Sequence, residues 1–201
     1  MKNFNDFTHQ LNESGLHVFD VDGVVFHPHA HVHVLDHKGN RVEKLNHHQF
    51  NTHQLQPGHK YDFSEFRNAE NFHTGSPIHP IIRKIKKIQQ HGGKVAFNSA
   101  RADFDDKDKV LNKFEKHGID MNKAHFHRAG NEPAEHSTGE KKNRVLRRVL
   151  DKGIHTHVHF YDDDKQNLHH FLKLKKEYPH IKFHAHHVDE TGATHKYEDK
   201  Q

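Results

Sequence analysis

Acidic residues come directly after two short apolar segments of the sequence. Asp20 and Asp22 lie at the end of the first segment, and Asp162, Asp163 and Asp164 follow the other. Side chains two residues apart in an extended chain point to the same side, so Asp20 and Asp22 can act on one group. Carboxylates serve as nucleophiles, as proton donors and acceptors, and as ligands of hard cations. An Asp-x-Asp-Gly sequence by itself also fits a turn or a calcium loop.

Hydroxyl and cationic side chains occupy similar positions elsewhere in the chain. Ser99 and Arg101 follow a further apolar segment, and Lys141 and Lys142 lie near the start of a predicted helix. In open α/β sheets, ligands bind at the carboxyl ends of the strands. The sequence therefore predicts one site to which separate segments each contribute a side chain.

Predicted strands and helices alternate along most of the chain. Short apolar segments predict strands over 17–21, 95–97, 124–127, 158–161 and 181–188, and a small terminal strand within 191–197. Apolar residues at helical spacing predict helices over 78–90, 106–117, 140–150 and 168–178. This order is typical of an α/β protein with a parallel sheet of about five strands and helices on both faces. The charged residues Arg83, Lys84, Lys86 and Lys87 are expected on the solvated side of their helix.

One polar stretch interrupts the alternation and predicts a small insertion after the first strand. It contains a hairpin and a short helix, expected over 31–35, 41–45 and 46–55. Its aromatic residues Phe63, Phe66 and Phe72 are expected to form its own small core. We therefore predict a core of residues 1–24 and 76–201, with a cap-like insertion over 25–75.

Composition excludes several classes of protein. The 201 residues include no Cys, which excludes disulfides and thiolate chemistry, and 31% are hydrophobic, which suits one domain with a modest core. No apolar run is long enough for a membrane helix, and the first 16 residues contain no apolar segment typical of a secretory signal. We expect a cytoplasmic protein with no membrane partner.

Taken in order, the motifs of residues 17–164 resemble those of the haloacid dehalogenase (HAD) superfamily of phosphotransferases. These motifs are a strand ending in DxD, a strand ending in Ser or Thr, a helix-borne Lys and a strand ending in paired acids. Segments 99–104, 127–131 and 161–168 also resemble small HAD-type proteins of tailed phages, which would act in the host cytoplasm. The resemblance implies a three-layer, Rossmann-like HAD core.

The resemblance also implies a role for each site residue. Asp20 is the expected nucleophile, forming an aspartyl-phosphate, and Asp22 the general acid and base. Ser99 and a lysine are expected to hold the phosphoryl oxygens. Lys142 fits the family spacing better, and Lys141 remains the alternative. Further phosphate or substrate contacts are expected from Gly23, Ala100, Arg101 and Lys141, and for Arg101 a position on the solvated surface is the alternative.

Magnesium is the cofactor that the resemblance implies. Its expected ligands are the Asp20 carboxylate, the Asp22 backbone carbonyl and Asp162. Asp163 is expected to act through a water molecule or from outside the ligand set. The part taken by Asp164 stays open.

These expectations predict a magnesium-dependent phosphomonoester hydrolase. Its substrate is expected to be a nucleotide, a nucleic-acid end or a small phosphorylated metabolite. One alternative is a non-catalytic binding protein with the HAD fold. Another is a histidine-rich metal-binding or pH-responsive protein, because 28 residues are His. Many of these His residues recur at spacing two, which also fits solvated or half-buried strand faces: His31 and His33, His125 and His127, His155, His157 and His159, and His184 and His186.

Overall fold

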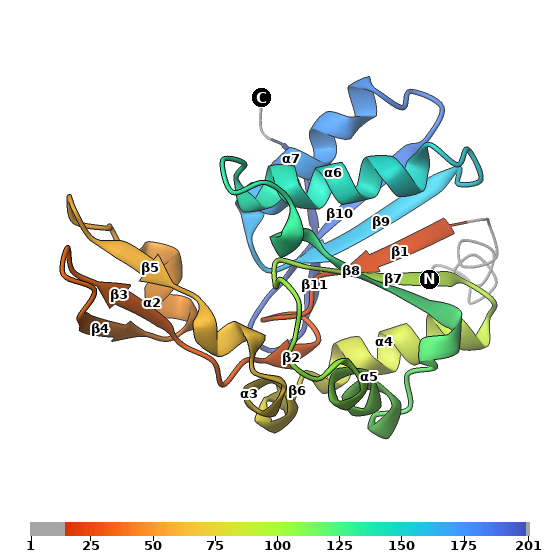
Figure 1. The fold of residues 1–201 in the computed structure, drawn as a ribbon. Helices are drawn as coiled ribbons and strands as arrows, with labels where there is room; N and C mark the ends of the chain where they lie inside the picture. The colour runs from red at the N-terminus through yellow and green to blue at the C-terminus, as the bar shows by residue number, and fades with distance from the viewer. Residues whose placement is uncertain (1–14, 200–201) are drawn as a thin grey trace.

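A mostly parallel β-sheet forms the centre of the protein (Figure 1). The computed structural model describes residues 15–199. The expectation about a secretory signal concerns mainly the first 14 residues, which lie outside this described part. The strands, in spatial order, are β11 (Thr194–Tyr197), β10 (Lys182–Val188), β9 (His157–Asp162), β1 (Gly15–Phe19), β7 (Lys94–Ser99) and β8 (Ala124–Arg128). All neighbours are parallel except β11, which is antiparallel to β10 at one edge. The predicted α/β class with a parallel sheet is confirmed, and the terminal strand is the antiparallel sixth.

Helices cover both faces of this sheet (Figure 1). One face packs against α4 (His79–Gln90) and α5 (Lys107–Lys116), and the other against α6 (Thr138–Leu150) and α7 (Lys165–Lys173). Short 3-10 turns extend the connections: η2 (Met121–Lys123), η3 (Ala129–Asn131) and η4 (Leu174–Lys176). The resulting three layers are compatible with a Rossmann-like fold. In the described part of the chain, no helix combines the length and the apolar character needed to cross a bilayer.

Helix α4 has a buried apolar face, as predicted, but one of its charged residues does not lie on the solvated side. Its isoleucines at three- and four-residue spacing are buried against the sheet. Lys84, however, is not on a solvated side. Its Nζ lies 5.2 Å from the centre of the Tyr161 ring and donates a hydrogen bond to Thr194 Oγ1 at 3.0 Å. Burial lowers the pKa of Lys84, because the charged ammonium is partly removed from water.

The insertion forms a small cap that projects from the core (Figure 1). Its antiparallel sheet has the order β4 (Arg41–Leu45), β3 (Val32–Leu35) and β5 (Lys60–Asp62), with α2 (His47–Thr52) beside it. The predicted hairpin and short helix are therefore present, and β5 is an additional strand. Val32, Val34 and Leu45 form the buried centre of the cap. A cluster this small relies on its attachment to the core.

Two chain connections attach the cap to the core. They include the strand pair β2 (Phe26–His27) and β6 (Ser76–Pro77), the turn η1 (Ser64–Arg67) and the helix α3 (Ala69–Thr74). Phe72 of α3 packs in the main core, edge-on to Phe26 at 5.5 Å between ring centres. The ends of the predicted insertion 25–75 thus belong to the core.

The expectation that Phe63, Phe66 and Phe72 form one cap core is wrong, because only Phe66 packs in the cap cluster and Phe63 is 47% exposed.

Histidine rings stack across the middle of the central sheet. His17 of β1, His159 of β9 and His184 of β10 are stacked with 4.5 Å between neighbouring ring centres. His159 Nδ1 and His186 Nε2 share a hydrogen bond of 3.1 Å, and His186 stacks on Tyr161 at 4.5 Å. We call His17, His159, His184 and His186 the imidazole stack. It corresponds to the half-buried packing that the histidine spacing allowed.

Candidate functional site

Three titratable side chains meet at the carboxyl end of the central sheet. Asp20 follows β1, Asp162 ends β9, and Lys142 reaches them from α6. Lys142 Nζ lies 2.9 Å from Asp20 Oδ1 and 2.7 Å from Asp162 Oδ2. All three are buried, with exposed fractions of 6% or less. Parallel neighbouring strands bring Asp20 and Asp162 to the same sheet edge, which is why residues 142 positions apart in the sequence share one ammonium.

A third carboxylate gives this cluster an excess of negative charge. Asp20, Asp162 and Asp163 each offer an oxygen within 4.8 Å of the others. Burial raises the pKa of Asp20 to about 8; Lys142 opposes the shift, and the neighbouring carboxylates add to it. Burial likewise raises the pKa of Asp162. One ammonium does not balance three crowded carboxylates, so this set of hard oxygen donors fits a divalent cation such as magnesium.

The protonation of Lys142 follows from the same contacts. Burial alone would lower the pKa of this ammonium, but Asp162 and Asp20 outweigh burial and raise it above its ordinary value. Lys142 is thus held as a cation against both carboxylates. Lys141, the alternative at the sequence level, lines the adjacent cavity together with Lys142, and Lys142 is the lysine that contacts both carboxylates.

The remaining acids near Asp162 have different partners. Asp164 is the N-cap of α7, where its side chain accepts a hydrogen bond from Gln166 N at 2.8 Å. Asn167, which the sequence analysis missed, donates from Nδ2 to Asp162 Oδ1 at 3.1 Å. Its signal in the sequence is its position in the first helical turn after three consecutive acids, five residues beyond Asp162. The polar contact of Asn167 orients an oxygen of the expected metal ligand.

Asp22 lies outside the cluster of three carboxylates because its side chain is paired with Arg101. Arg101 Nε and Nη2 donate to Asp22 Oδ2 and Oδ1, each at 2.7 Å. The guanidinium is buried, although Arg101 also contributes to the wall of the cavity. Arg101, which was expected to contact phosphate, therefore pairs in this structure with Asp22, the expected general acid.

The other predicted contact residues divide between the cavity wall and the backbone beneath it. Ala100 lines the cavity with Lys141. Ser99 is fully buried and is not among the described residues that line the cavity. Its Oγ accepts a hydrogen bond from Arg101 N at 3.1 Å. Gly23 N donates to Phe26 O at 2.9 Å, and its φ of 78° allows the turn after the two aspartates.

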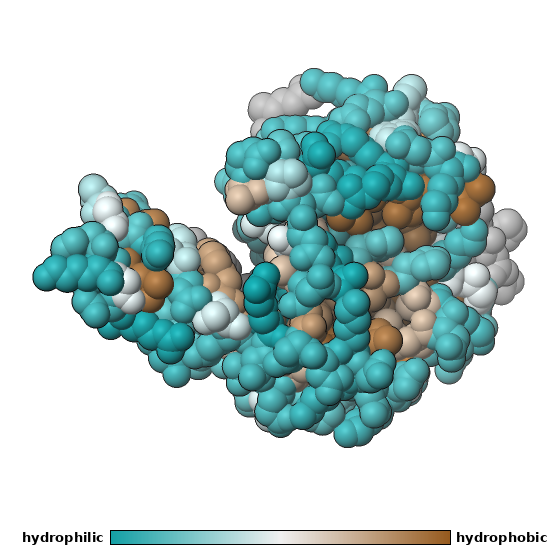
Figure 2. Space-filling model, in the orientation of Figure 1, coloured by the Kyte–Doolittle hydropathy of each residue, from teal (hydrophilic) through white to brown (hydrophobic). Residues whose placement is uncertain are grey.

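A cavity of about 570 Å³ separates these charged groups from the cap. Asp20, Asp22 and Asp163 line it from the core, and Phe50, Phe63 and Phe66 line it from the cap. Figure 2 shows the hollow between cap and core, with hydrophobic surface on the cap side. Ring centres of Phe50 and Phe63 lie 5.5 Å apart in an edge-to-face arrangement. The cavity thus combines an ionic floor with an aromatic wall.

Close backbone packing shapes the side of this cavity. Gly130 of η3 lies against the loop after β7, and a Cβ at this position would be 2.4 Å from Ala100 O. Gly130 N also donates to Arg101 O at 3.2 Å. A side chain at position 130 would therefore displace the loop that carries Arg101.

Comparison with known proteins adds no family assignment. No protein-family model matches the chain, and no curated protein matches its sequence.

Proposed function

We propose that the protein is a magnesium-dependent phosphomonoester hydrolase of the haloacid dehalogenase type, with Asp20 as its nucleophile. The observation that carries this proposal is the contact of Lys142 with both Asp20 and Asp162, beside Asp163, at the floor of the cavity. A carboxylate held in one orientation by an ammonium is suited to attack phosphorus without a separate activating base.

The reaction has two steps. An oxygen of Asp20 attacks phosphorus, and the bond from phosphorus to the leaving oxygen breaks, while Asp22 gives that oxygen a proton. This step leaves an aspartyl-phosphate on Asp20. A water molecule then attacks the same phosphorus, Asp22 accepts its proton, and inorganic phosphate and the free Asp20 carboxylate are formed. Lys142 keeps Asp20 oriented through both steps.

Asp20, Asp162 and Asp163 are the side chains that would hold magnesium. When bound, the ion supplies the positive charge that keeps Asp20 ionised and neutralises the phosphoryl group. Asn167 supports this arrangement through its hydrogen bond to Asp162. The share of the Asp22 backbone carbonyl in the ligand set stays a prediction.

The cavity favours a substrate with a flat, apolar leaving group. The aromatic wall of Phe50, Phe63 and Phe66 stands opposite the carboxylates, and Arg67 and Lys141 add positive charge. Nucleobases stack on aromatic side chains with about 1–3 kcal/mol per base. Of the substrate classes expected from the sequence, a nucleotide therefore fits this cavity better than a small aliphatic metabolite.

Hydrolysis of p-nitrophenyl phosphate tests the proposal. We expect activity that requires magnesium and that falls at least about 10³-fold in Asp20→Asn, because the amide is not a nucleophile. The matched control is Asp108→Asn, which removes an exposed carboxylate from α5 and leaves activity unchanged. Full activity in Asp20→Asn would overturn the assignment of the nucleophile.

A substrate panel tests the leaving group separately. Nucleoside monophosphates are expected to have a higher kcat/KM than ribose 5-phosphate, since only the former can stack on the aromatic wall. Equal values would leave the hydrolase proposal standing and would contradict the preference for a nucleobase. An absence of hydrolysis across the panel would instead favour the non-catalytic binding protein.

A further inference from the structure

Arg101 occupies a buried position between the core and the cap. Its side chain is 1% exposed, and all of its guanidinium nitrogens are engaged. Nε and Nη2 donate to the two oxygens of Asp22, while Nη1 donates to Phe66 O at 2.7 Å. A single guanidinium thus joins the expected proton-transfer residue to a backbone carbonyl of the cap connection.

Aromatic rings surround this guanidinium. The Arg101 Cζ lies 4.8, 5.1 and 5.5 Å from the ring centres of Phe66, Phe72 and Phe104. Ring faces attract a cation, and exclusion of water strengthens its hydrogen bonds to a carboxylate. Lysine cannot reproduce this arrangement, because it lacks the planar fork that contacts both oxygens of Asp22.

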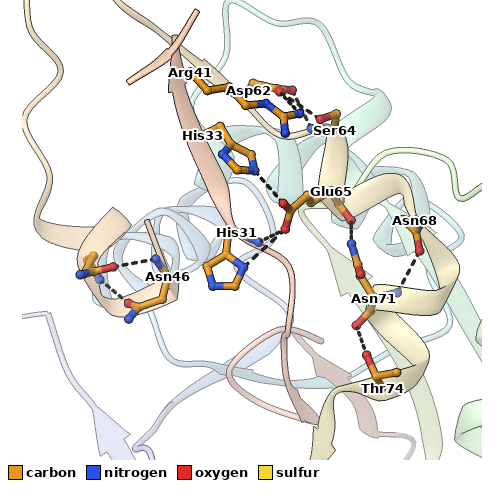
Figure 3. A network of polar contacts seen from close by, with 11 residues as sticks. His31, His33, Arg41, Asn46, Asp62, Ser64, Glu65, Asn68, Asn71 and Thr74 are labelled. Carbon is orange, nitrogen blue, oxygen red and sulfur yellow. Dashed lines mark hydrogen bonds and ion pairs between the residues drawn. The ribbon is translucent and has the colours of Figure 1, made fainter. Parts of the chain in front are cut away.

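The turn that carries Phe66 is also attached to the cap sheet, as Figure 3 shows. Glu65, the preceding residue, accepts a hydrogen bond from His31 N at 2.9 Å and contacts His33 Nε2 at 2.6 Å. His33 belongs to β3, the central strand of the cap. Contacts therefore run without a break from the cap sheet through Glu65 and Phe66 to Arg101 and Asp22.

We propose that Arg101 is a positioning residue, which orients the Asp22 carboxylate and makes that orientation depend on the position of the cap. The inference rests on the proposed function, because it assumes that Asp22 exchanges protons with the leaving oxygen and with water. Both Asp22 oxygens accept hydrogen bonds from one rigid fork, so a shift of η1 that moves the guanidinium also turns the carboxylate. The cap then acts on the chemistry through hydrogen bonds as well as by enclosing the substrate.

Two aryl phosphates of similar shape test this role. p-Nitrophenol leaves readily without a proton, whereas phenol depends on an acid. In Arg101→Gln, we expect kcat/KM to fall about 100-fold for phenyl phosphate and less than about 10-fold for p-nitrophenyl phosphate, because general acid catalysis contributes roughly 10²–10⁴-fold. The ratio kcat/KM is the suitable readout, since it covers only the steps up to departure of the phenol.

Further variants separate positioning from a structural role. Glu65→Gln leaves the contact of Arg101 with Asp22 in place but weakens the link from η1 to β3, so it should give the same substrate dependence with a smaller loss. Arg101→Lys should not restore the wild-type ratio between the two substrates. Arg83→Gln, which removes an exposed cation from α4, should leave both rates unchanged. If Arg101→Gln does not fold, Glu65→Gln decides the question.

The outcomes distinguish this inference from the proposed function. A larger loss for phenyl phosphate in Arg101→Gln and in Glu65→Gln supports positioning through the cap. An equal loss for both substrates overturns it and leaves Arg101 as a general contact of the phosphate or of the fold. A wild-type protein that hydrolyses neither substrate contradicts the proposed function itself.

Discussion

The carboxyl ends and the middles of the same strands bury titratable groups in different ways. At the ends of β1 and β9, Asp20 and Asp162 share the Lys142 ammonium. A few residues earlier, His17 and His159 lie in the imidazole stack, where ring contacts replace ion pairs. The strand ends place carboxyl groups against an ammonium, whereas the strand middles place imidazole rings against one another.

This difference shows how the chemistry of a group determines the partners that it needs when buried. An aspartate cannot be buried as an anion without a cation or hydrogen-bond donors, so the strand ends require Lys142, Asn167 and the proposed magnesium ion. Imidazole has a neutral form near neutral pH, so it can pack as a flat ring and hydrogen-bond to a neighbouring imidazole. The hydrogen bond between His159 and His186 requires that one of them donates and the other accepts.

The largest expected effect follows removal of the shared cation. Lys142→Met should lower the free energy of unfolding by about 3–5 kcal/mol in the absence of magnesium, because it leaves two buried carboxyl groups without their shared cation. Urea unfolding with a chelator measures this loss. Addition of magnesium should restore part of the stability, since the ion replaces the missing charge.

Lys141→Met is the matched control for that variant. Lys141 lies on the cavity wall and is partly exposed, so its removal should change stability by no more than about 0.5 kcal/mol. Equal losses in the two variants would show that the position of Lys142 between the carboxylates has no special importance.

A smaller effect is expected from the imidazole stack on acidification. Burial lowers the pKa of His17 to about 4, of His186 to about 3 and of His159 to about 2, and for His17 and His186 the nearby Lys84 ammonium contributes to this shift. Below about pH 6.5 the unfolded chain therefore binds more protons than the folded protein. The free energy of unfolding should fall as the pH decreases from about 6.5 to about 4.

Replacement of one ring sharpens this prediction. Chemical unfolding at a series of pH values should show a weaker pH dependence for His159→Leu than for the wild type. His180→Leu, at an exposed position, should keep the wild-type slope. An unchanged slope in His159→Leu would mean that other groups account for the acid sensitivity.

The smallest expected effect is zinc binding by the imidazole stack. The rings are nearly parallel, with planes 11° to 13° apart in the closest contacts, so their nitrogen atoms do not converge on one point. Among the described residues, the only group of three or more metal-binding side chains that converges is Asp20, Asp162 and Asp163. Calorimetry should show weak uptake of zinc at several places. One tight site that disappears in His159→Leu would contradict this expectation and favour a metal-binding function.

Local sequence patterns predicted most of the elements around the site. Apolar segments followed by Asp20, Ser99 and Asp162 located the strand ends, because side-chain burial imposes a regular pattern on strands and helices. The same patterns predicted α4 to α7 to within a few residues, apart from the C-terminal part of the last helix, which is the turn η4.

Pairing between distant residues was harder to predict. The pairing of Arg101 with Asp22 was not predicted, and Lys84 was expected in solvent and instead lies over Tyr161. Phe63 and Phe72 both have polar neighbours in the sequence, yet one lines the cavity and the other lies in the main core. Each of these outcomes depends on the packing of elements far apart in the chain, about which local spacing carries no information.

The sequence by itself determined the alternation of strands and helices in the core, the absence of thiol chemistry and the polar residues at the ends of β1, β7 and β9. These properties depend on local periodicity and on residue chemistry, so they can be read without a structure. Only the tertiary structure decided that Lys142 joins Asp20 to Asp162, that Arg101 joins Asp22 to the cap, and that the rings of the imidazole stack lie against one another. Those contacts join residues far apart in the chain, and burial then determines which groups carry charge.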